Sequence, residues 1–128
     1  MNTETEKTIL VIDDSRTFRV MVTFAIKKFT RFKKPVEAAD GLEGLEAMAK
    51  NDIELVVCDI NMPNMDGLEF VKTIRANENY KNIPVIMLTT EGADESRKKA
   101  LDAGASSYLQ KPFKPNELTE EMKKFITI

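Results

Sequence analysis

The chain has 128 residues, of which 42% are hydrophobic and 31% charged, and this composition is typical of one folded domain. Its 19 basic and 21 acidic residues give a formal charge of −2, which argues against binding to a nucleic acid backbone. The single cysteine excludes an internal disulfide and favours the cytoplasm, and the absence of histidine removes the commonest general base and metal ligand. Because the first residues are polar and no long apolar run follows, we expect neither a signal peptide nor a membrane span.

Short apolar runs alternate with amphipathic segments along the whole chain. The runs predict five strands, most of them buried on both faces: Thr8–Asp13, Val36–Ala39, Leu55–Asp59, Ile83–Thr89 and Ser106–Gln110. Apolar residues spaced by three or four predict five helices between and after them, in order Phe18, Val22, Ala25 and Phe29; Leu42, Leu45 and Ala49; Leu68, Val71 and Ile74; Ala93, Ala100 and Leu101; and Leu118, Met122 and Phe125. This alternation predicts a doubly wound α/β fold with a five-stranded parallel sheet.

Polar side chains stand where several of these strands end. Asp13 and Asp14 follow the first strand, Asp59 closes the third, Thr89 ends the fourth and Lys111 follows the fifth. Parallel strands end at one edge of the sheet, so we expect these groups to meet there. Three carboxylates need a compensating charge, and Mg²⁺ is well suited to such a site. For Asp14 alone, a helix N-cap is an equally good interpretation.

These residues belong to longer motifs. The chain resembles the receiver domains of two-component response regulators, most closely the single-domain chemotaxis regulators of the CheY type. The matching segments are VIDDS (Val11–Ser15), ADG (Ala39–Gly41), DINMPNMDG (Asp59–Gly67), LTTE (Leu88–Glu91) and AGASSYLQKPF (Ala103–Phe113). The resemblance implies a flavodoxin-like (βα)5 fold with strand order 2-1-3-4-5, in which residues 7–128 form the receiver domain. The polar residues 1–6 are expected to be a disordered tail.

The resemblance also implies a chemistry for the strand-end residues. Asp59 would accept a phosphoryl group from a histidine kinase. Asp14, Asp59 and Asn61 would hold Mg²⁺, with Asp13 acting through water. Lys111 would pair with the phosphoryl oxygens.

Further roles follow from the same resemblance. Thr89 would donate its hydroxyl to the phosphoryl group and act with Tyr108 as a switch. Asn61 and Glu91 would tune the rate at which the phosphoryl group is hydrolysed, and the Lys111–Pro112 peptide bond would be cis. The implied protein is a stand-alone cytoplasmic regulator and not an enzyme, although it assists its own phosphorylation and dephosphorylation.

The implied partners are the histidine kinase, an output protein and a phosphatase. The output protein, for which the flagellar motor switch is the candidate, would bind the face formed by the fourth helix, the fifth strand and the fifth helix. We expect a monomer that binds neither nucleic acid nor membrane. Two alternatives are open: a phosphorelay intermediate, and an aspartate-nucleophile phosphatase of the haloacid dehalogenase type. The second would have an acid where Asn61 stands and a cap insertion, which this sequence lacks.

Other conspicuous residues have simpler interpretations. Met62 and Met65 are predicted to cover the edge of the core instead of binding a metal, and Cys58 is predicted to be a small buried apolar residue. Tyr108 is expected to be half-buried. The basic segment from Lys27 to Lys34 is predicted to be a solvated helix end and loop, with docking to an acidic partner as the alternative.

Overall fold

Five strands alternate with five helices, as predicted. The computed structural model describes residues 6–90 and 94–128. Its strands are β1 (Thr8–Ile12), β2 (Val36–Ala38), β3 (Ile53–Asp59), β4 (Val85–Thr89) and β5 (Ser107–Gln110). Its helices are α1 (Arg16–Phe29), α2 (Gly41–Lys50), α3 (Gly67–Arg75), α4 (Asp94–Ala103) and α5 (Pro115–Lys123). Most of the expected tail, residues 1–5, and Ala93 of the expected fourth helix lie outside the described residues.

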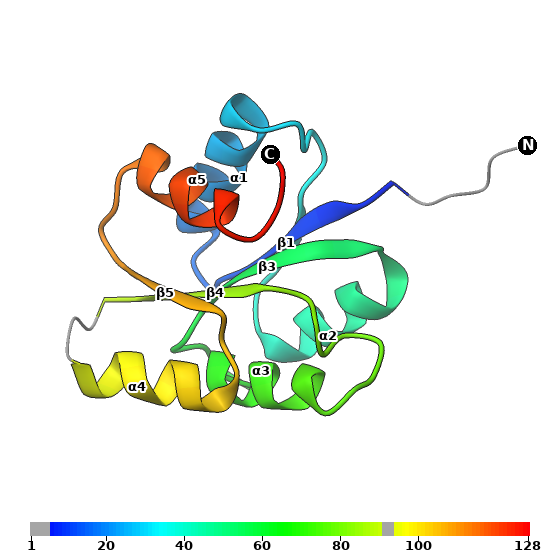
Figure 1. Cartoon of the computed structure of the whole chain (residues 1–128), viewed down its shortest axis with the longest axis vertical. Coiled ribbons are helices and arrows are strands. Elements are labelled where there is room, and N and C mark those ends of the chain that lie inside the picture. Colours follow the sequence, from blue (N-terminus) through cyan, green and yellow to red (C-terminus); the bar gives the residue numbers. More distant parts are fainter. Residues whose placement is uncertain (1–5, 91–93) are drawn as a thin grey trace, which may run out of the picture.

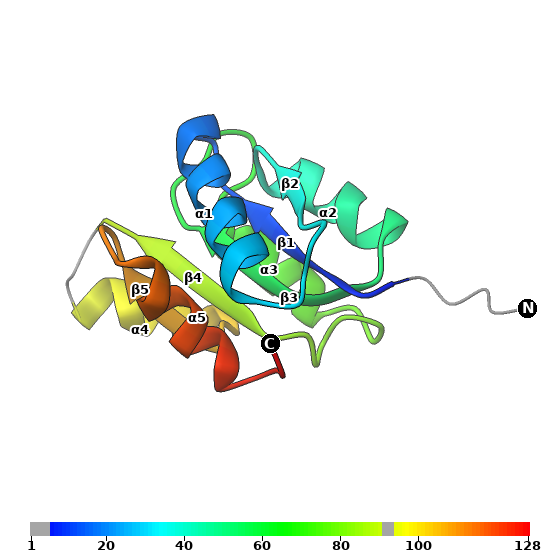
Figure 2. The same cartoon turned by 90° about the horizontal axis from the view of Figure 1, so that it is seen from above.

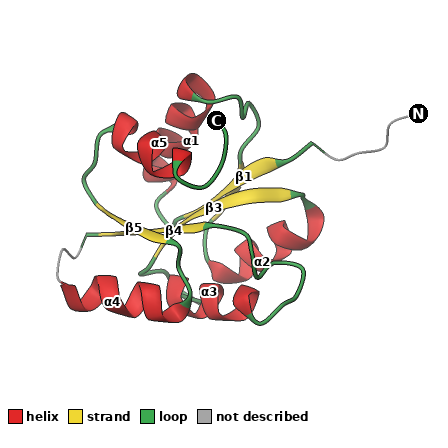
Figure 3. Cartoon of the chain, in the orientation of Figure 1, coloured by secondary structure: helices red, strands yellow, loops and turns green. Residues whose placement is uncertain are grey.

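The sheet is parallel and has helices on both faces. Its strand order is β2-β1-β3-β4-β5. Figure 1 shows α1 and α5 together on one face and α2, α3 and α4 on the other, and Figure 2 shows the same layers from above. Figure 3 separates the central strands from the two helical layers by colour. The predicted doubly wound fold and its strand order are therefore confirmed.

The central strands are buried on both faces because each contributes to two apolar layers. In β1, Ile9 and Val11 pack in the layer under α1 and α5, whereas Leu10 and Ile12 pack in the layer over α2 and α3. All four side chains are fully buried. This arrangement explains the uninterrupted apolar run, since alternate side chains of a strand point to opposite faces. Cys58 is buried in the same way, as predicted.

Register brings the ends of the central strands level with one another. Ile12 pairs with Cys58, so that Asp13 and Asp59 are the next residues on adjacent strands. Asp59 in turn pairs with Leu88, which precedes Thr89. The polar residues after the apolar runs consequently gather at the carboxyl edge of the sheet.

Several predicted bounds are wrong by one or two residues: the first two strands end one residue earlier than predicted, the third begins at Ile53 and the fifth at Ser107. The fourth strand begins at Val85, not Ile83, since Pro84 has no N–H to donate to a neighbouring strand. Phe29, expected on the buried face of the first helix, is 51% exposed, and Phe32 from the following loop is buried in that layer instead.

Four more apolar residues of the predicted helical patterns are exposed. Leu42 and Leu101 are 50% and 41% exposed, and Ala49 is exposed as well. Small residues, Gly44 in α2 and Ala100 in α4, take the buried positions of their helices and allow close packing. Phe125 follows the end of α5 at Lys123 and is exposed. Among the described residues, no helix combines the length and apolarity that crossing a membrane requires.

Candidate functional site

Three carboxylates and one ammonium group meet at the carboxyl edge of the sheet. Asp13, Asp14 and Asp59 each offer an oxygen, and these oxygens lie within 4.8 Å of one another. Lys111 Nζ lies 2.8 Å from Asp13 Oδ2 and 3.3 Å from Asp59 Oδ1. The structure thus brings together four of the groups predicted from the strand ends.

The turn from β1 into α1 holds the acid pair. Asp13 is almost fully buried, and its Oδ1 accepts a hydrogen bond from the Ser15 N–H at 2.9 Å. Ser15 is the N-cap of α1 and accepts from the Phe18 N–H. The N-cap interpretation of Asp14 is therefore wrong, and Asp14 is an exposed carboxylate beside the buried one. Arg19 Nη1 donates to the Asp13 carbonyl oxygen at 2.6 Å, which ties α1 to the strand end.

The loop after Asp59 is held by close backbone approach. Gly67 N–H donates to the Ile60 carbonyl at 2.8 Å, and Ile60 N–H donates to the Leu88 carbonyl at 3.1 Å. A Cβ on Gly67 would collide with the carbonyl oxygen of Asp59, so this position requires glycine. Asn61 is exposed in this loop, directly after the buried strand end.

The same loop is also tied to α2. Asn64 has a φ of 65°, a left-handed conformation that asparagine tolerates. Its Nδ2 donates to Asp40 Oδ2 at 2.7 Å, while Asp40 Oδ1 accepts from the Glu43 N–H at 2.9 Å and caps α2. These hydrogen bonds lower the pKa of the buried Asp40 carboxyl. Sequence analysis did not find this link, although the ADG motif contains one partner.

Lys111 is directed toward the acids by its backbone. Its N–H donates to the Thr89 carbonyl oxygen at 2.6 Å, and the Lys111–Pro112 peptide bond is cis. Thr89 is 1% exposed at the end of β4. Tyr108 is half-buried on β5 and packs against the core layer on the α2 to α4 side, as expected for an aromatic residue at that position. Glu91 lies outside the described residues.

Burial and like charge disfavour ionisation of Asp59. Desolvation is the main cause, followed by the charge of Asp13, and together they raise the pKa of Asp59 to about 6 against the opposing effect of Lys111. The charged form of Asp59 is therefore unfavourable here, and a bound cation would stabilise it. Cys58, one residue earlier, is fully buried, and burial raises the pKa of its thiol well above the usual value.

The donor set suits a hard divalent cation. All three acidic groups supply carboxylate oxygens, the ligands that Mg²⁺ prefers, and Asp14 is open to solvent for the water molecules that Mg²⁺ keeps. Met62 and Met65 are not part of this cluster but pack against the core, as predicted.

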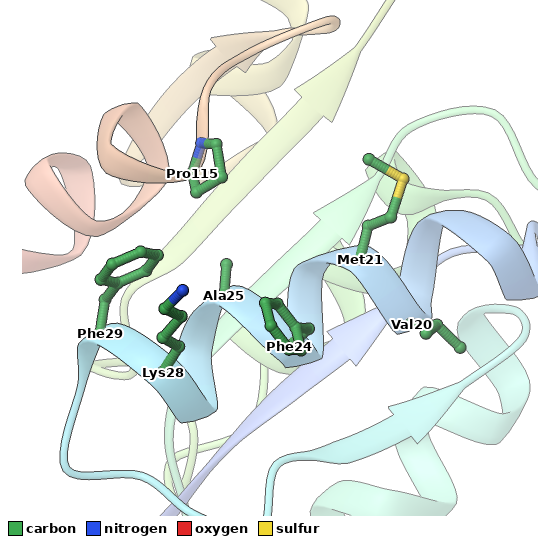
Figure 4. Close-up of a pocket in the computed structure, with 7 residues that line it drawn as sticks. All are labelled: Val20, Met21, Phe24, Ala25, Lys28, Phe29 and Pro115. Carbon is green, nitrogen blue, oxygen red and sulfur yellow. The ribbon is translucent and has the colours of Figure 1, made fainter.

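A second surface runs along α1. Val20, Met21, Phe24 and Phe29 are each at least half exposed, at 51%, 62%, 62% and 51%. With Lys28 and Pro115 they line a groove of about 450 Å³ between α1 and the start of α5, which we call the α1 groove (Figure 4). The ammonium of Lys28 lies 5.8 Å and 5.5 Å from the ring centroids of Phe24 and Phe29. Exposed apolar clusters of this kind mark interaction surfaces.

Comparison with known proteins identifies the family. The model of the response regulator receiver domain matches residues 9–123. A chemotaxis protein CheY homolog of Campylobacter jejuni is 39% identical over 116 residues, which cover 90% of this chain and 88% of the relative. The chain belongs to the response regulator receiver domain family. Among curated relatives, its similarity to chemotaxis CheY proteins extends to CheY1 of Helicobacter pylori, at 39% identity over 90% of this chain and 93% of the relative.

Solved structures agree with this assignment. CheY4 of Vibrio cholerae superposes with a TM-score of 0.86 at 35% identity, covering 96% of this chain and all of that chain. The receiver domain of the sensor histidine kinase PA1611 from Pseudomonas aeruginosa superposes with a TM-score of 0.84 at 25% identity, covering 95% and 98%. The second structure has a magnesium ion coordinated in its active site cleft.

The raised pKa of Asp59 predicts that its charge destabilises the folded chain. Above about pH 6 the folded chain carries this charge at a cost that the unfolded chain does not have. Asp59→Asn should therefore raise the free energy of unfolding at pH 7 in chelator by about 1–2 kcal/mol, after allowance for solvent screening. The gain should shrink as the pH falls through 6 and vanish below about 4, where both states are protonated.

Urea unfolding of both proteins across this pH range measures the effect. Asp102→Asn, an exposed carboxylate on α4, is the matched control and should leave stability unchanged at every pH. A constant difference between Asp59→Asn and the wild type from pH 7 to pH 4 would contradict the prediction.

Proposed function

We propose that this chain is a phosphorylation-controlled regulator in which Asp59 accepts a phosphoryl group from a histidine kinase. The observation that carries the proposal is the placement of Asp59 among two further carboxylates and one ammonium group. A cation that binds there would reduce the repulsion among the carboxylates. Lys111 can offset the negative charge of an incoming phosphoryl group. The similarity to chemotaxis regulators supports the same role.

The transfer would use groups already at the sheet edge. An oxygen of Asp59 attacks the phosphorus of a phosphohistidine, the new P–O bond forms as the P–N bond breaks, and the imidazole leaves. Lys111, 3.3 Å from Asp59, donates to a phosphoryl oxygen. Thr89, on the neighbouring strand, offers its hydroxyl to another.

Asp14, Asp59 and the Asn61 carbonyl would hold Mg²⁺, with Asp13 acting through water. The ion supplies charge neutralisation when bound. Support comes from the three carboxylates within 4.8 Å of one another and from the magnesium-containing receiver domain of Pseudomonas aeruginosa. Asn61, two residues after the nucleophile, is not an acid, which disfavours the phosphatase alternative.

The kinase would dock on the α1 groove. Helix α1 begins at Arg16, two residues after Asp14, and Phe24 lies about 12 Å along the helix axis from Arg16. A partner that delivers its histidine to Asp59 would reach this groove by extending along α1. Lys27 and Lys28 in the last turn of α1 favour a partner with acidic residues at the edge of its contact surface.

The output surface would be formed by α4, β5 and α5. Tyr108 lines a groove of about 290 Å³ there, together with Arg97, Leu101, Glu121 and Phe125. Tyr108 pairs with Met87, two residues before Thr89 on the adjacent strand. Movement of the Thr89 hydroxyl toward the phosphoryl group would let Tyr108 turn inward and reshape this groove. Since the relatives from Campylobacter jejuni and Helicobacter pylori are chemotaxis proteins, the flagellar motor switch is the proposed output partner.

Asp59 should be the only residue that acetyl phosphate labels, and labelling should need Mg²⁺. Intact-mass measurement should show one added phosphoryl group on the wild type with Mg²⁺, and none with chelator or on Asp59→Asn. Asp14→Ala should take little or no label even with Mg²⁺, because it lacks one of the carboxylates that would hold the ion. Asp102→Asn is the control and should label normally. Equal labelling of Asp59→Asn and the wild type would disprove the assignment.

A change in the α1 groove should slow phosphoryl transfer from the kinase but not from acetyl phosphate. Phe24→Ser should slow phosphoryl transfer from the kinase by about 10-fold, as expected when an interface aromatic is lost, while transfer from acetyl phosphate stays unchanged. Leu42→Ser, which removes an apolar side chain that is 50% exposed on α2, is the control and should change neither rate. A Phe24→Ser variant with normal kinase-dependent transfer would exclude this groove.

The switch predicts a long-range response to beryllofluoride, an acyl-phosphate mimic. NMR spectra of the wild type should shift both around Asp59 and across α4, β5 and α5. In Thr89→Ala the shifts should stay in the acidic site, because the hydroxyl that couples the two regions is missing. Thr73→Ala, a hydroxyl on the surface of α3, should behave as the wild type. Wild-type shifts confined to the acidic site would favour the phosphorelay alternative.

A further inference from the structure

The ammonium of Lys111 contacts an aromatic ring as well as two acids. Its Nζ lies 3.9 Å from the ring centroid of Phe18, in addition to 2.8 Å from Asp13 and 3.3 Å from Asp59. The face of an aromatic ring attracts a cation, most strongly where water is excluded. The Lys111 side chain is only 15% exposed, so much of the water that would weaken this contact is absent.

Two features fix the position of the ring. The Phe18 N–H donates to Ser15 Oγ at 3.2 Å, which places the residue in the capped first turn of α1. The ring meets Phe113 edge to face, with centroids 5.8 Å apart and planes at 90°. Phe113 lies two residues after Lys111, so one loop supplies both the cation and the ring that supports Phe18. Both rings also pack against the core layer under α1 and α5.

We propose that Phe18 is a positioning residue for Lys111 in phosphoryl transfer, an inference that rests on the function proposed above. A lysine side chain is long and flexible, and it must leave the carboxylates for an incoming phosphoryl oxygen. The ring attracts the ammonium without accepting a conventional hydrogen bond, so the N–H groups remain available to oxygen acceptors. Phe18 therefore keeps the ammonium at the mouth of the site while its partners change from carboxylate to phosphoryl oxygens.

Substitutions at Phe18 separate this role from simple packing. Phe18→Leu keeps an apolar side chain but removes the ring, whereas Phe18→Tyr keeps the ring. With acetyl phosphate and Mg²⁺, Phe18→Leu should be labelled about 3- to 10-fold more slowly than the wild type, and Phe18→Tyr within about twofold of it. Mg²⁺ affinity, followed by NMR, should be the same in all three. Phe32→Leu is the matched control and should label at the wild-type rate, because the Phe32 ring contacts Arg31, at 4.2 Å, and not Lys111.

A second measurement does not depend on phosphorylation. In the metal-free wild type, the ring should shift the NMR signals of the Lys111 Cε protons upfield, and Phe18→Leu should abolish that shift. The proposal is overturned if the wild type lacks the shift, if Phe18→Leu is labelled at the wild-type rate, or if Phe18→Tyr is as slow as Phe18→Leu. A wild type that takes no label would instead refute the proposed function, and this role with it.

Discussion

Like charges forced together at the edge of a sheet are the constraint on which this molecule depends. Two such charges about 5 Å apart, at an effective dielectric of about 20, repel by about 3 kcal/mol. The fold makes the repulsion unavoidable, because β1 and β3 are adjacent parallel strands, Asp13 directly follows β1, and β3 ends in Asp59. One ammonium group, from a third strand end, offsets part of it. The remaining repulsion lowers the stability of the folded chain and favours the binding of a cation at this edge.

The surroundings of that edge are built to keep it in place. Backbone hydrogen bonds hold the loop after Asp59 to β4 and the start of α3, and the backbone of Lys111 is held by Thr89. Capping by Ser15 and the bond from Arg19 fix the turn after Asp13. The main chain around Asp13, Asp59 and Lys111 is thus anchored, and the Asp13 carboxylate is itself held by the Ser15 N–H.

Much of the fold and of the site could be predicted because they depend on local pattern. Apolar runs ending in polar residues mark strands that stop at one edge, and a parallel sheet then brings Asp13, Asp59 and Lys111 together. The exposure of Phe29 and Leu42 could not be predicted, because an apolar residue at helical spacing does not show where the neighbouring layer ends. The contact between the Phe18 ring and Lys111 joins residues distant in sequence, and no local pattern indicates it.

The two helical layers give the two sides of the molecule different surfaces. Helix α1 presents an apolar groove on the side that it shares with α5, while α4 lies on the opposite face of the sheet. Strand β5 and helix α5 adjoin both regions, and the residues of their connecting loop include Lys111 and Phe113. The acidic edge lies between the two sides.

The bond between Asp40 and Asn64 restricts which residues are compatible with the start of α2. Serine and threonine are good helix N-caps, as good in many proteins as aspartate. Here one oxygen of Asp40 caps the helix and the other accepts from Asn64 in the loop that follows Asp59. Serine and threonine have a single side-chain oxygen on a shorter side chain, so they would lose one of these two hydrogen bonds. The identity of the residue that caps α2 is therefore set by the loop that follows Asp59.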